Sequence, residues 1–323
     1  MNTDSPALHQ VVGPDSAATK WDTRLVTRFS DRSMSEETRR AYRRVIREFF
    51  LFIDHQHPLN VTTDDVIRWR DDLRRRKKKA ATISFKLSVI RSFFEYLKAA
   101  GLASTNPAST KFVAPPEVST DGAGRALTVK EVSHVLAGPN RETAIGARDY
   151  AILLLMLRTS LRVSEVCALM RSSIKWSHGR WIVKFQVKGG RERRIPLPTD
   201  VREAIEAYIK LDWKRREMLL SDGEDSYLFQ PHTNYRTLVF NKPLSARMVW
   251  NIVSRWADYG GVGKLSPHDL RRTAITRALD QGLSYRQVQM MSGHKDPKTV
   301  MRYDHGRENL DLNAVNFLNY EET

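Results

Sequence analysis

The sequence predicts a mainly α-helical protein that contains one small antiparallel β-sheet. In several segments apolar residues recur at the spacing of an α-helix, which places them on one face. Between residues 35 and 53 these residues are Tyr42, Val45, Ile46, Phe49 and Phe50. From residue 181 to 187 apolar residues follow the alternating spacing of a half-buried strand. Gly189 and Gly190 then predict a turn, after which residues 191–197 return as a second strand.

Charge is the strongest signal in the composition. The 323 residues carry 53 Lys and Arg against 37 Asp and Glu, which gives a formal net charge of +16. Such an excess favours a polyanionic partner, and nucleic acid is the usual one. The alternative is a basic protein whose charge serves only its solubility.

Cysteine usage and hydropathy indicate the compartment. Cys167 is the only cysteine, so a disulfide within one chain is excluded and a reducing cytoplasm is the expected location. The longest apolar run, residues 150–157, is far shorter than the roughly 20 residues that cross a bilayer. The first residues lack the basic and apolar regions of a signal peptide, so we expect a cytoplasmic protein.

Composition divides the chain into domains. Residues 1–24 are polar and are expected to form a flexible N-terminal extension. A helical domain is expected over residues 25–107, followed by a linker rich in Ala, Pro, Ser, Thr and Gly over 108–124. A second domain is expected over 125–303, and residues 304–323 predict a C-terminal helix.

Several helix starts carry capping signals. Ser35 precedes two glutamates, and Thr62 or Thr63 precedes a segment with two aspartates. Thr128 and Glu131 form a capping-box pattern at the entry to the second domain. From about Arg148 to Thr159 a helix would carry apolar residues on almost every face, which predicts a buried helix.

Cations gather in the first domain, where Arg74 to Lys79 form a run of six. In a protein that is already basic, such a run is expected to contact phosphates, although a solvated loop is the simpler alternative. The predicted DNA-binding residues are Arg39, Arg43, Arg74, Arg75, Arg76, Lys77, Lys78, Lys79 and Arg272.

Ionisable residues of the second domain lie beside apolar segments. Arg162 and Glu165 are three residues apart, so a helix would place them on one face. A carboxylate behind an arginine orients it for a phosphate or carboxylate ligand, although a surface ion pair is the simpler interpretation. Lys188 stands at the glycine turn of the predicted hairpin, and His268 and Arg271 are also three residues apart.

The stretch around His294 and Tyr303 contains two helix boundaries. Gly293 predicts the end of a helix that begins at Ser284, and His294 follows directly. Asp296 then resembles an N-cap, with proline in the first helical position. This pattern predicts that Tyr303 lies about two turns into a short new helix.

In chain order, these residues resemble the tyrosine recombinase (phage integrase) family, whose compact members include Xer-type and transposon-type recombinases. The residues that match are Arg162, Lys188, His268, Arg271, His294 and Tyr303. The likeness covers nearly the whole chain. Ser160 stands where the family usually has glycine, and Val187 precedes the lysine where the family usually has glycine.

The resemblance implies an N-terminal helical (SAM-like) core-binding domain and a C-terminal α+β catalytic domain. It also implies a site-specific recombinase that acts without metal, ATP or another cofactor in the bacterial cytoplasm, in association with the nucleoid. Tyr303 would attack the DNA backbone and form a 3′-phosphotyrosine, and Lys188 would protonate the leaving 5′-oxygen. The phosphate would be held by Arg162, Arg271 and His294, with His268 assisting proton movement and Glu165 orienting Arg162 or His268.

The resemblance further implies a homotetramer on two core sites of double-stranded DNA, with a dimer on each site. A partner recombinase or an accessory protein is compatible with the sequence. The C-terminal segment has an apolar helical stripe at Leu310, Ala314, Phe317 and Leu318. This stripe would dock on a neighbouring protomer or pack within its own chain, and amphipathicity does not distinguish the two.

Three other functions are compatible with parts of the sequence. A catalytically silent DNA-binding or architectural protein is disfavoured because all six reactive positions hold competent residues. A type IB topoisomerase shares the tyrosine chemistry, but the separate helical domain and the tail favour a recombinase. A metal-dependent nuclease is disfavoured because the nine histidines show no metal-ligand spacing.

Overall fold

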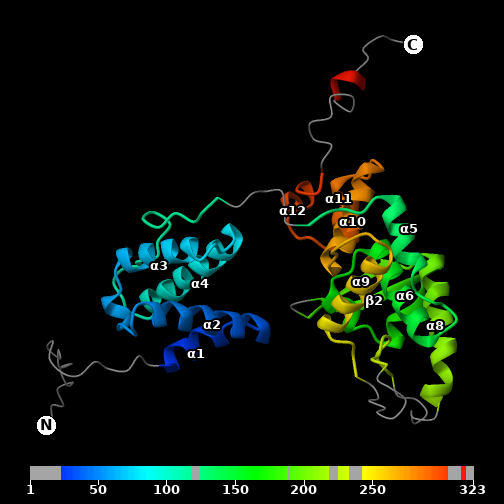
Figure 1. Ribbon diagram of the computed structural model, residues 1–323, viewed down its shortest axis with the longest axis horizontal. Coiled ribbons are helices and arrows are strands. Elements are labelled where there is room, and N and C mark those ends of the chain that lie inside the picture. Colours follow the sequence, from blue (N-terminus) through cyan, green and yellow to red (C-terminus); the bar gives the residue numbers. More distant parts are fainter. Residues whose placement is uncertain are drawn as a thin grey trace, which may run out of the picture. The chain divides into compact units, whose positions relative to one another are not determined.

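The computed structural model describes residues 23–117, 124–187, 190–217, 225–232, 242–304 and 314–317. The chain divides into two compact units, residues 1–120 and 121–323 (Figure 1). None of the helices in the described ranges is both long and apolar enough to cross a membrane.

The first unit is a helical bundle, as the sequence predicts. Its elements are α1 (Thr23–Asp31), α2 (Glu36–Phe52), a 3-10 turn (Pro58–Asn60), α3 (Thr63–Arg75) and α4 (Ala80–Ala99). Ser35 caps α2, and Thr62 caps α3 through a capping box with Asp65, which confirms both predicted helix starts. Helix α1 was not among the predicted helices.

Aromatic side chains form the core of the first unit. Phe49 contacts Trp69 edge to face at 5.0 Å between ring centroids, and both are buried. Ala108 and Val113 are buried in the same core, and their carbonyls accept hydrogen bonds from Arg91 at 2.9 and 3.4 Å. The chain therefore stays packed on this unit as far as Val113, within the segment expected to be a linker.

The second unit combines helices with a three-stranded antiparallel sheet. Its first elements are α5 (Val129–Ala137), α6 (Ala144–Thr159), α7 (Val163–Cys167), β1 (Ile174–Ser177), β2 (Arg180–Val187) and β3 (Arg191–Pro196). Its later helices are α8 (Thr199–Glu217), α9 (Ala246–Tyr259), α10 (Pro267–Asp280), α11 (Tyr285–Ser292) and α12 (Pro297–Met301). Within the described ranges, 3-10 turns lie at Arg171–Ser173 and Ala314–Phe317.

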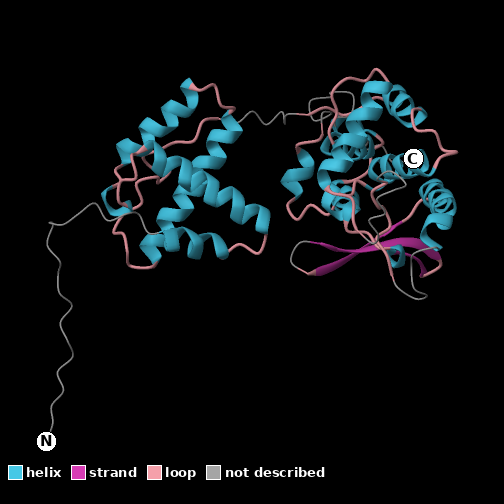
Figure 2. Cartoon of the chain, turned by 60° about the horizontal axis from the view of Figure 1, so that its bottom comes forward, coloured by secondary structure: helices cyan, strands magenta, loops and turns pink. Residues whose placement is uncertain are grey.

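The sheet has the order β1-β2-β3 and lies along one side of the helices of its unit (Figure 2). Strands β2 and β3 confirm the two strands predicted around the glycine turn, and Phe185 pairs with Arg193 across them. Strand β1 was not predicted. It has only four residues and their burial does not alternate, so it lacks the period that identifies a strand.

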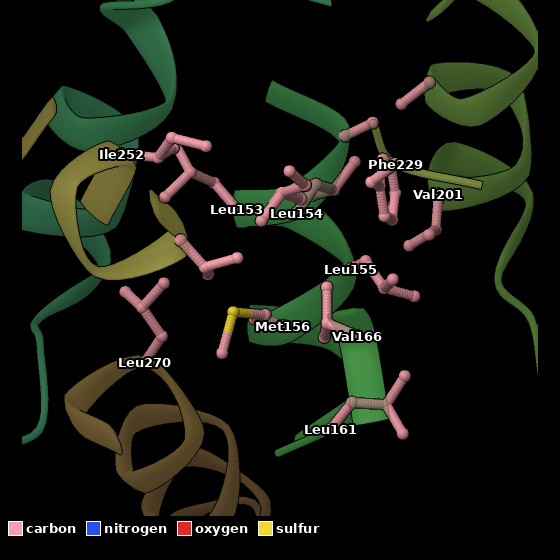
Figure 3. Close-up of a cluster of buried hydrophobic side chains, with 14 of the residues drawn as sticks. Leu153, Leu154, Leu155, Met156, Leu161, Val166, Val201, Phe229, Ile252 and Leu270 are labelled. Carbon is pink, nitrogen blue, oxygen red and sulfur yellow. The ribbon is translucent and has the colours of Figure 1, made fainter. Parts of the chain in front are cut away.

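Helix α6 forms the centre of the second core, which confirms the predicted buried helix. Leu153, Leu154, Leu155 and Met156 occupy four successive positions of α6, and all four side chains are buried (Figure 3). Side chains from α8, α9 and α10, among them Leu270, belong to the same cluster. This helix therefore fixes the start of α7 and the position of α10, which carry the predicted site arginines.

The predicted C-terminal helix over residues 304–323 lies mostly outside the described residues. The structure describes Ala314–Phe317 there as a 3-10 turn. The stripe predicted from Leu310 and Leu318 therefore stays a prediction.

Candidate active site

Arg162 and Glu165 stand at the start of α7, directly after a sharp turn of the backbone. Helix α6 ends at Ser160, which adopts the left-handed conformation with φ 53°. Arg162 is the N-cap residue of α7. Its backbone N–H and its Nη1 donate to the two carboxylate oxygens of Glu165 at 2.8 and 3.0 Å. The pair therefore caps the start of α7, whereas the sequence suggested that the two residues lie on one face of a helix.

The two partners differ in exposure. The side chain of Glu165 is 6% exposed, and that of Arg162 is 42% exposed. A buried carboxylate thus holds an arginine whose remaining N–H groups reach solvent. This arrangement orients a guanidinium toward an incoming anion.

Arg271 joins three segments of the second unit at one point. Although Arg271 is only 2% exposed, its guanidinium donates to the carbonyl oxygens of Ser160 and Ser292, the latter at 2.7 Å. Its Nη2 also lies 3.0 Å from Nε2 of His294. Burial, and then repulsion from Arg162, lowers the pKa of Arg271 to about 10.

His294 follows Gly293, which ends α11 in the left-handed conformation with φ 70°, as the sequence predicts. Nδ1 of the ring lies 3.0 Å from Oγ of Ser292, and Nε2 faces Arg271. Burial, and then the charge of Arg271, lowers the pKa of His294 to about 4. The ring is therefore neutral at neutral pH. Since a guanidinium only donates, Nε2 carries the lone pair and Nδ1 carries the hydrogen.

Tyr303 lies beside His294. Asp296 caps α12 with Pro297 in the first turn, as predicted, but α12 ends at Met301. Tyr303 therefore follows the end of this helix, and the prediction that it lies two turns inside a helix was wrong. The backbone N–H of Tyr303 donates to the carbonyl of Val300 at 2.9 Å, which closes the last turn.

A small apolar cluster holds the Tyr303 ring. Its other buried members are Ile275, Ala278, Val288 and Val300, from α10, α11 and α12. The ring is stacked on the imidazole of His294, with 5.9 Å between ring centroids and 19° between ring planes. Tyr303 is 7% exposed, so packing fixes its position before any ligand arrives.

His268 stands in the first turn of α10, after Pro267, at the surface of the unit. Loss of hydration around its ring, followed by repulsion from Arg271 and Arg272, lowers its pKa. The positive charge of Arg162 also lowers the pKa of His268. The positive charges of this cluster therefore act on His268, and its ring is neutral at neutral pH.

Lys188 lies outside the described residues, which stop at Val187 and resume at Gly190. The last paired residues of the described hairpin are Val187 in β2 and Arg191 in β3.

Arg193 is a member of the cluster that the sequence analysis missed. Its Nη2 donates to the carbonyls of Met290, at 2.8 Å, and of Met291, at the end of α11. Burial lowers its pKa, and Glu165 and Arg162 act on it electrostatically. A signal was available, because residues directly opposite in an antiparallel pair share a face and Arg193 pairs with the inward Phe185.

The predicted DNA-binding residues differ in their surroundings. All six residues from Arg74 to Lys79 are exposed, at the end of α3 and the start of α4. Their three arginines form ion pairs with Asp71 and Asp72. The three lysines form no ion pair with any residue in the described ranges, so their charge is free for a polyanion.

The other three predicted DNA contacts are engaged within the chain. Arg43 forms an ion pair with Asp31 at 2.7 Å, and Arg39 donates to the carbonyl of Ser33 at 2.6 Å. Arg272 is only 7% exposed, and its guanidinium carbon lies 5.0 Å from the centroid of the Tyr303 ring. The structure thus places Arg272 at the predicted nucleophile.

A model of the phage integrase family matches residues 125–309, which are more than half of the chain. The chain belongs to the phage integrase family of tyrosine recombinases. A model described as the phage integrase N-terminal SAM-like domain matches residues 27–101 of this recombinase. The predicted family and fold class are therefore confirmed, and the protein is an enzyme of site-specific DNA recombination.

Relatives of the chain include Xer recombinases. The recombinase is 30% identical over 280 residues to the tyrosine recombinase XerC of Roseiflexus castenholzii, with 85% of each chain covered. It is 29% identical over 280 residues to the tyrosine recombinase XerD of Halalkalibacterium halodurans, with 85% of this chain and 89% of the relative covered.

Solved structures share the fold at lower identity. XerH bound to palindromic difH substrate, in a post-cleavage complex, aligns with a TM-score of 0.65 and 14% identity. That alignment covers 91% of this chain and 88% of XerH. A lambda integrase dimer bound to a COC′ core site aligns with a TM-score of 0.63 and 20% identity, over 89% of this chain and 96% of that one.

Proposed function

We propose that this recombinase cuts and rejoins DNA through a covalent bond between Tyr303 and the 3′-phosphate of the cleaved strand, without metal or ATP. The observation that carries the proposal is the meeting of Arg162, Arg271, His294 and Tyr303. These residues come from separate segments of the chain. Arg271 contacts His294 and the carbonyl of Ser160, two residues before Arg162, and His294 stacks on Tyr303. Transfer of a phosphoryl group to tyrosine requires a nucleophile beside cationic and hydrogen-bonding groups that hold the phosphate.

The electrostatics of the site favour a phosphate. The lowered pKa values of Arg271, Arg193 and His294 each include repulsion from neighbouring arginines. Glu165 provides a compensating negative charge. A phosphodiester between Arg162 and Arg271 would offset the excess positive charge, and the additional charge of the transition state would offset it further.

In the cleavage step the Tyr303 hydroxyl attacks phosphorus. A bond forms between Oη and phosphorus while the bond from phosphorus to the 5′-oxygen breaks, so the phosphodiester energy stays in the phosphotyrosine. The phenolic proton passes to neutral His268. By family resemblance, Lys188 donates a proton to the leaving 5′-oxygen. Reversal of the same steps rejoins the strand.

His294 has a specific part in this scheme. In the DNA-free protein its Nε2 accepts from Arg271, so it has no hydrogen there to donate. Contact with a non-bridging phosphate oxygen through Nε2 therefore requires that the ring gain a proton. The negative charge of a bound phosphate favours that gain, since it opposes the arginines that lower the pKa of His294.

Double-stranded DNA is the proposed partner, held by both units, with two protomers on each core site and four in the recombining complex. The net charge of +16 and the exposed lysines from Lys77 to Lys79 support binding to phosphates. The lambda integrase dimer bound to a core site supports two protomers per site. A monomeric topoisomerase would act on one duplex and would not exchange strands.

The test is a covalent-capture assay in EDTA. A nicked duplex carries a core site selected from random duplexes by its binding to the enzyme, and the products are separated under denaturing conditions. Wild type and Tyr259→Phe, a variant of a tyrosine that is 71% exposed, are expected to form a protein–DNA adduct. Tyr303→Phe is expected to bind the DNA and form none.

Each other outcome rejects part of the proposal. An adduct with Tyr303→Phe excludes Tyr303 as the nucleophile. DNA binding without any adduct from wild type favours the catalytically silent DNA-binding protein. Relaxation of supercoiled plasmid without strand exchange between two sites favours the topoisomerase.

A further inference from the structure

Arg272 is a buried cation that forms no ion pair within the described part of the chain, although the carboxylate of Asp269 lies nearby. It is 7% exposed, and its Nε is buried and forms no hydrogen bond with the residues that the structure describes. Two other buried arginines of the unit differ. Arg148 forms an ion pair with Asp149 at 2.7 Å, and Arg271 has three acceptors.

The backbone at Gly124 covers Nε of Arg272. A Cβ atom added at Gly124 would lie 3.3 Å from this nitrogen and 2.6 Å from Oδ1 of Asp269. The φ of Gly124 is 146°, a conformation that side-chain-bearing residues rarely adopt. The chain thus passes closely over Arg272, and this passage keeps its Nε from solvent.

The guanidinium of Arg272 faces the predicted nucleophile. Its central carbon lies 5.0 Å from the centroid of the Tyr303 ring, within the range of a cation–π contact. The ring also stacks on His294. Tyr303 is therefore in contact with one neutral ring and one permanent cation.

A buried charge without a direct ion pair destabilises a fold, and an apolar side chain of similar length would fill the same space at lower cost. The charge therefore needs an explanation other than packing. A cation beside Tyr303 stabilises negative charge that appears on the phenol oxygen and spreads into the ring. That charge appears when the hydroxyl loses its proton and again when the phenoxide leaves phosphorus.

We propose that Arg272 is a positioning residue for Tyr303 that also supplies the counter-charge of its phenoxide. The inference rests on the proposed role of Tyr303 as nucleophile. Arg272 takes up no proton and forms no covalent bond. The phenolic proton goes to the base, the bond from Oη to phosphorus forms, and the bond to the 5′-oxygen breaks. Arg272 acts only through its charge and its contact with the ring.

The test compares Arg272→Met, Arg272→Lys and the control Arg277→Met in single-turnover cleavage. Arg277 lies on the same helix but is 44% exposed, so its replacement removes one charge without reaching Tyr303. Arg272→Met is expected to slow adduct formation about 10- to 100-fold. Arg272→Lys should lose less, since it keeps the charge, and Arg277→Met should match wild type.

The pH profile separates this role from a structural one. The loss in Arg272→Met should be constant from mildly acidic to neutral pH and should shrink at alkaline pH, where hydroxide forms phenoxide without a counter-charge. A merely structural defect would lower the rate by the same factor at every pH. A loss that persists unchanged into alkaline pH would overturn the proposal.

A strand that ends in a 3′-(4-nitrophenyl) phosphate provides a second readout. In a Tyr303→Phe background it is joined to a 5′-hydroxyl strand without the tyrosine, and its leaving group needs little stabilisation. Adding Arg272→Met there should change the joining rate by less than about threefold. A loss as large as that in cleavage would place the action of Arg272 on the phosphate or the fold and overturn the proposal.

The remaining outcomes separate a failure of this inference from a failure of the proposed function. If Arg272→Met does not fold, Arg272→Lys and Arg272→Gln carry the comparison, and equal rates for these two would overturn the counter-charge. If wild type forms the adduct through Tyr303 and Arg272→Met is equally fast, only this inference fails. If wild type forms no adduct, the proposed function fails and this inference fails with it.

Discussion

Replacement of Glu165 by glutamine tests how the site arginines are held. Glu165 is 6% exposed and accepts from both the backbone N–H and Nη1 of Arg162, through its two oxygens. An amide keeps the shape but has only one oxygen, so one of the two bonds is lost. The substitution also removes the negative charge that offsets Arg193 and Arg271.

The two hydrogen bonds set the size of the effect. Loss of a hydrogen bond to a charged group costs about 1.5–3 kcal/mol. The free energy of unfolding should fall by about 1.5–3 kcal/mol, which for a unit of this size lowers the melting temperature by about 3–12 °C.

Glu131→Gln is a matched control. Glu131 holds the same place in the capping box of α5, where hydrogen bonds from Arg125 and from the backbone of Thr128 lower its pKa to about 2. Both variants should therefore lose stability in thermal unfolding. Only Glu165→Gln should also slow adduct formation, by about 10-fold or more, because only it releases Arg162. Wild-type cleavage by folded Glu165→Gln would refute this reasoning.

Two further substitutions test the site. His294→Gln should flatten the decline of stability between about pH 6.5 and pH 4. The pKa of His294 is lowered to about 4 in the folded state, so the unfolded state binds more protons in that window and wild-type stability is lost as the pH falls. Denaturant titrations of both proteins at several pH values check this, and equal slopes would contradict it. Ser160→Gly should change the free energy of unfolding by less than about 1 kcal/mol, since relief of the left-handed φ of 53° offsets the lost hydrogen bond to Met291. A large change in either direction would show that one of these two effects dominates.

Features with a local cause could be predicted from the sequence. The caps at Ser35, Thr62 and Thr128 depend on side chains within three residues, and each forms as predicted. The left-handed end of α11 at Gly293 depends on the absence of a side chain there. The alternation in β2 likewise identified a strand with one buried face.

Features that depend on tertiary contacts could not be predicted in the same way. The sequence placed Arg272 with the DNA contacts because it is charged and lies beside other cations. Its burial against Tyr303 depends on the packing of α10 against the end of α12 and on the passage of the chain at Gly124. The early end of α12 also escaped prediction, because no glycine or proline marks it between Pro297 and Tyr303.

Identification of the tyrosine that carries DNA tests the central claim most directly. The covalent adduct would be digested with a protease and a nuclease, and the modified peptide sequenced by mass spectrometry. We expect a nucleotide 3′-phosphate on Tyr303. The same modification on Tyr285, Tyr259 or Tyr320, with Tyr303 unmodified, would contradict it.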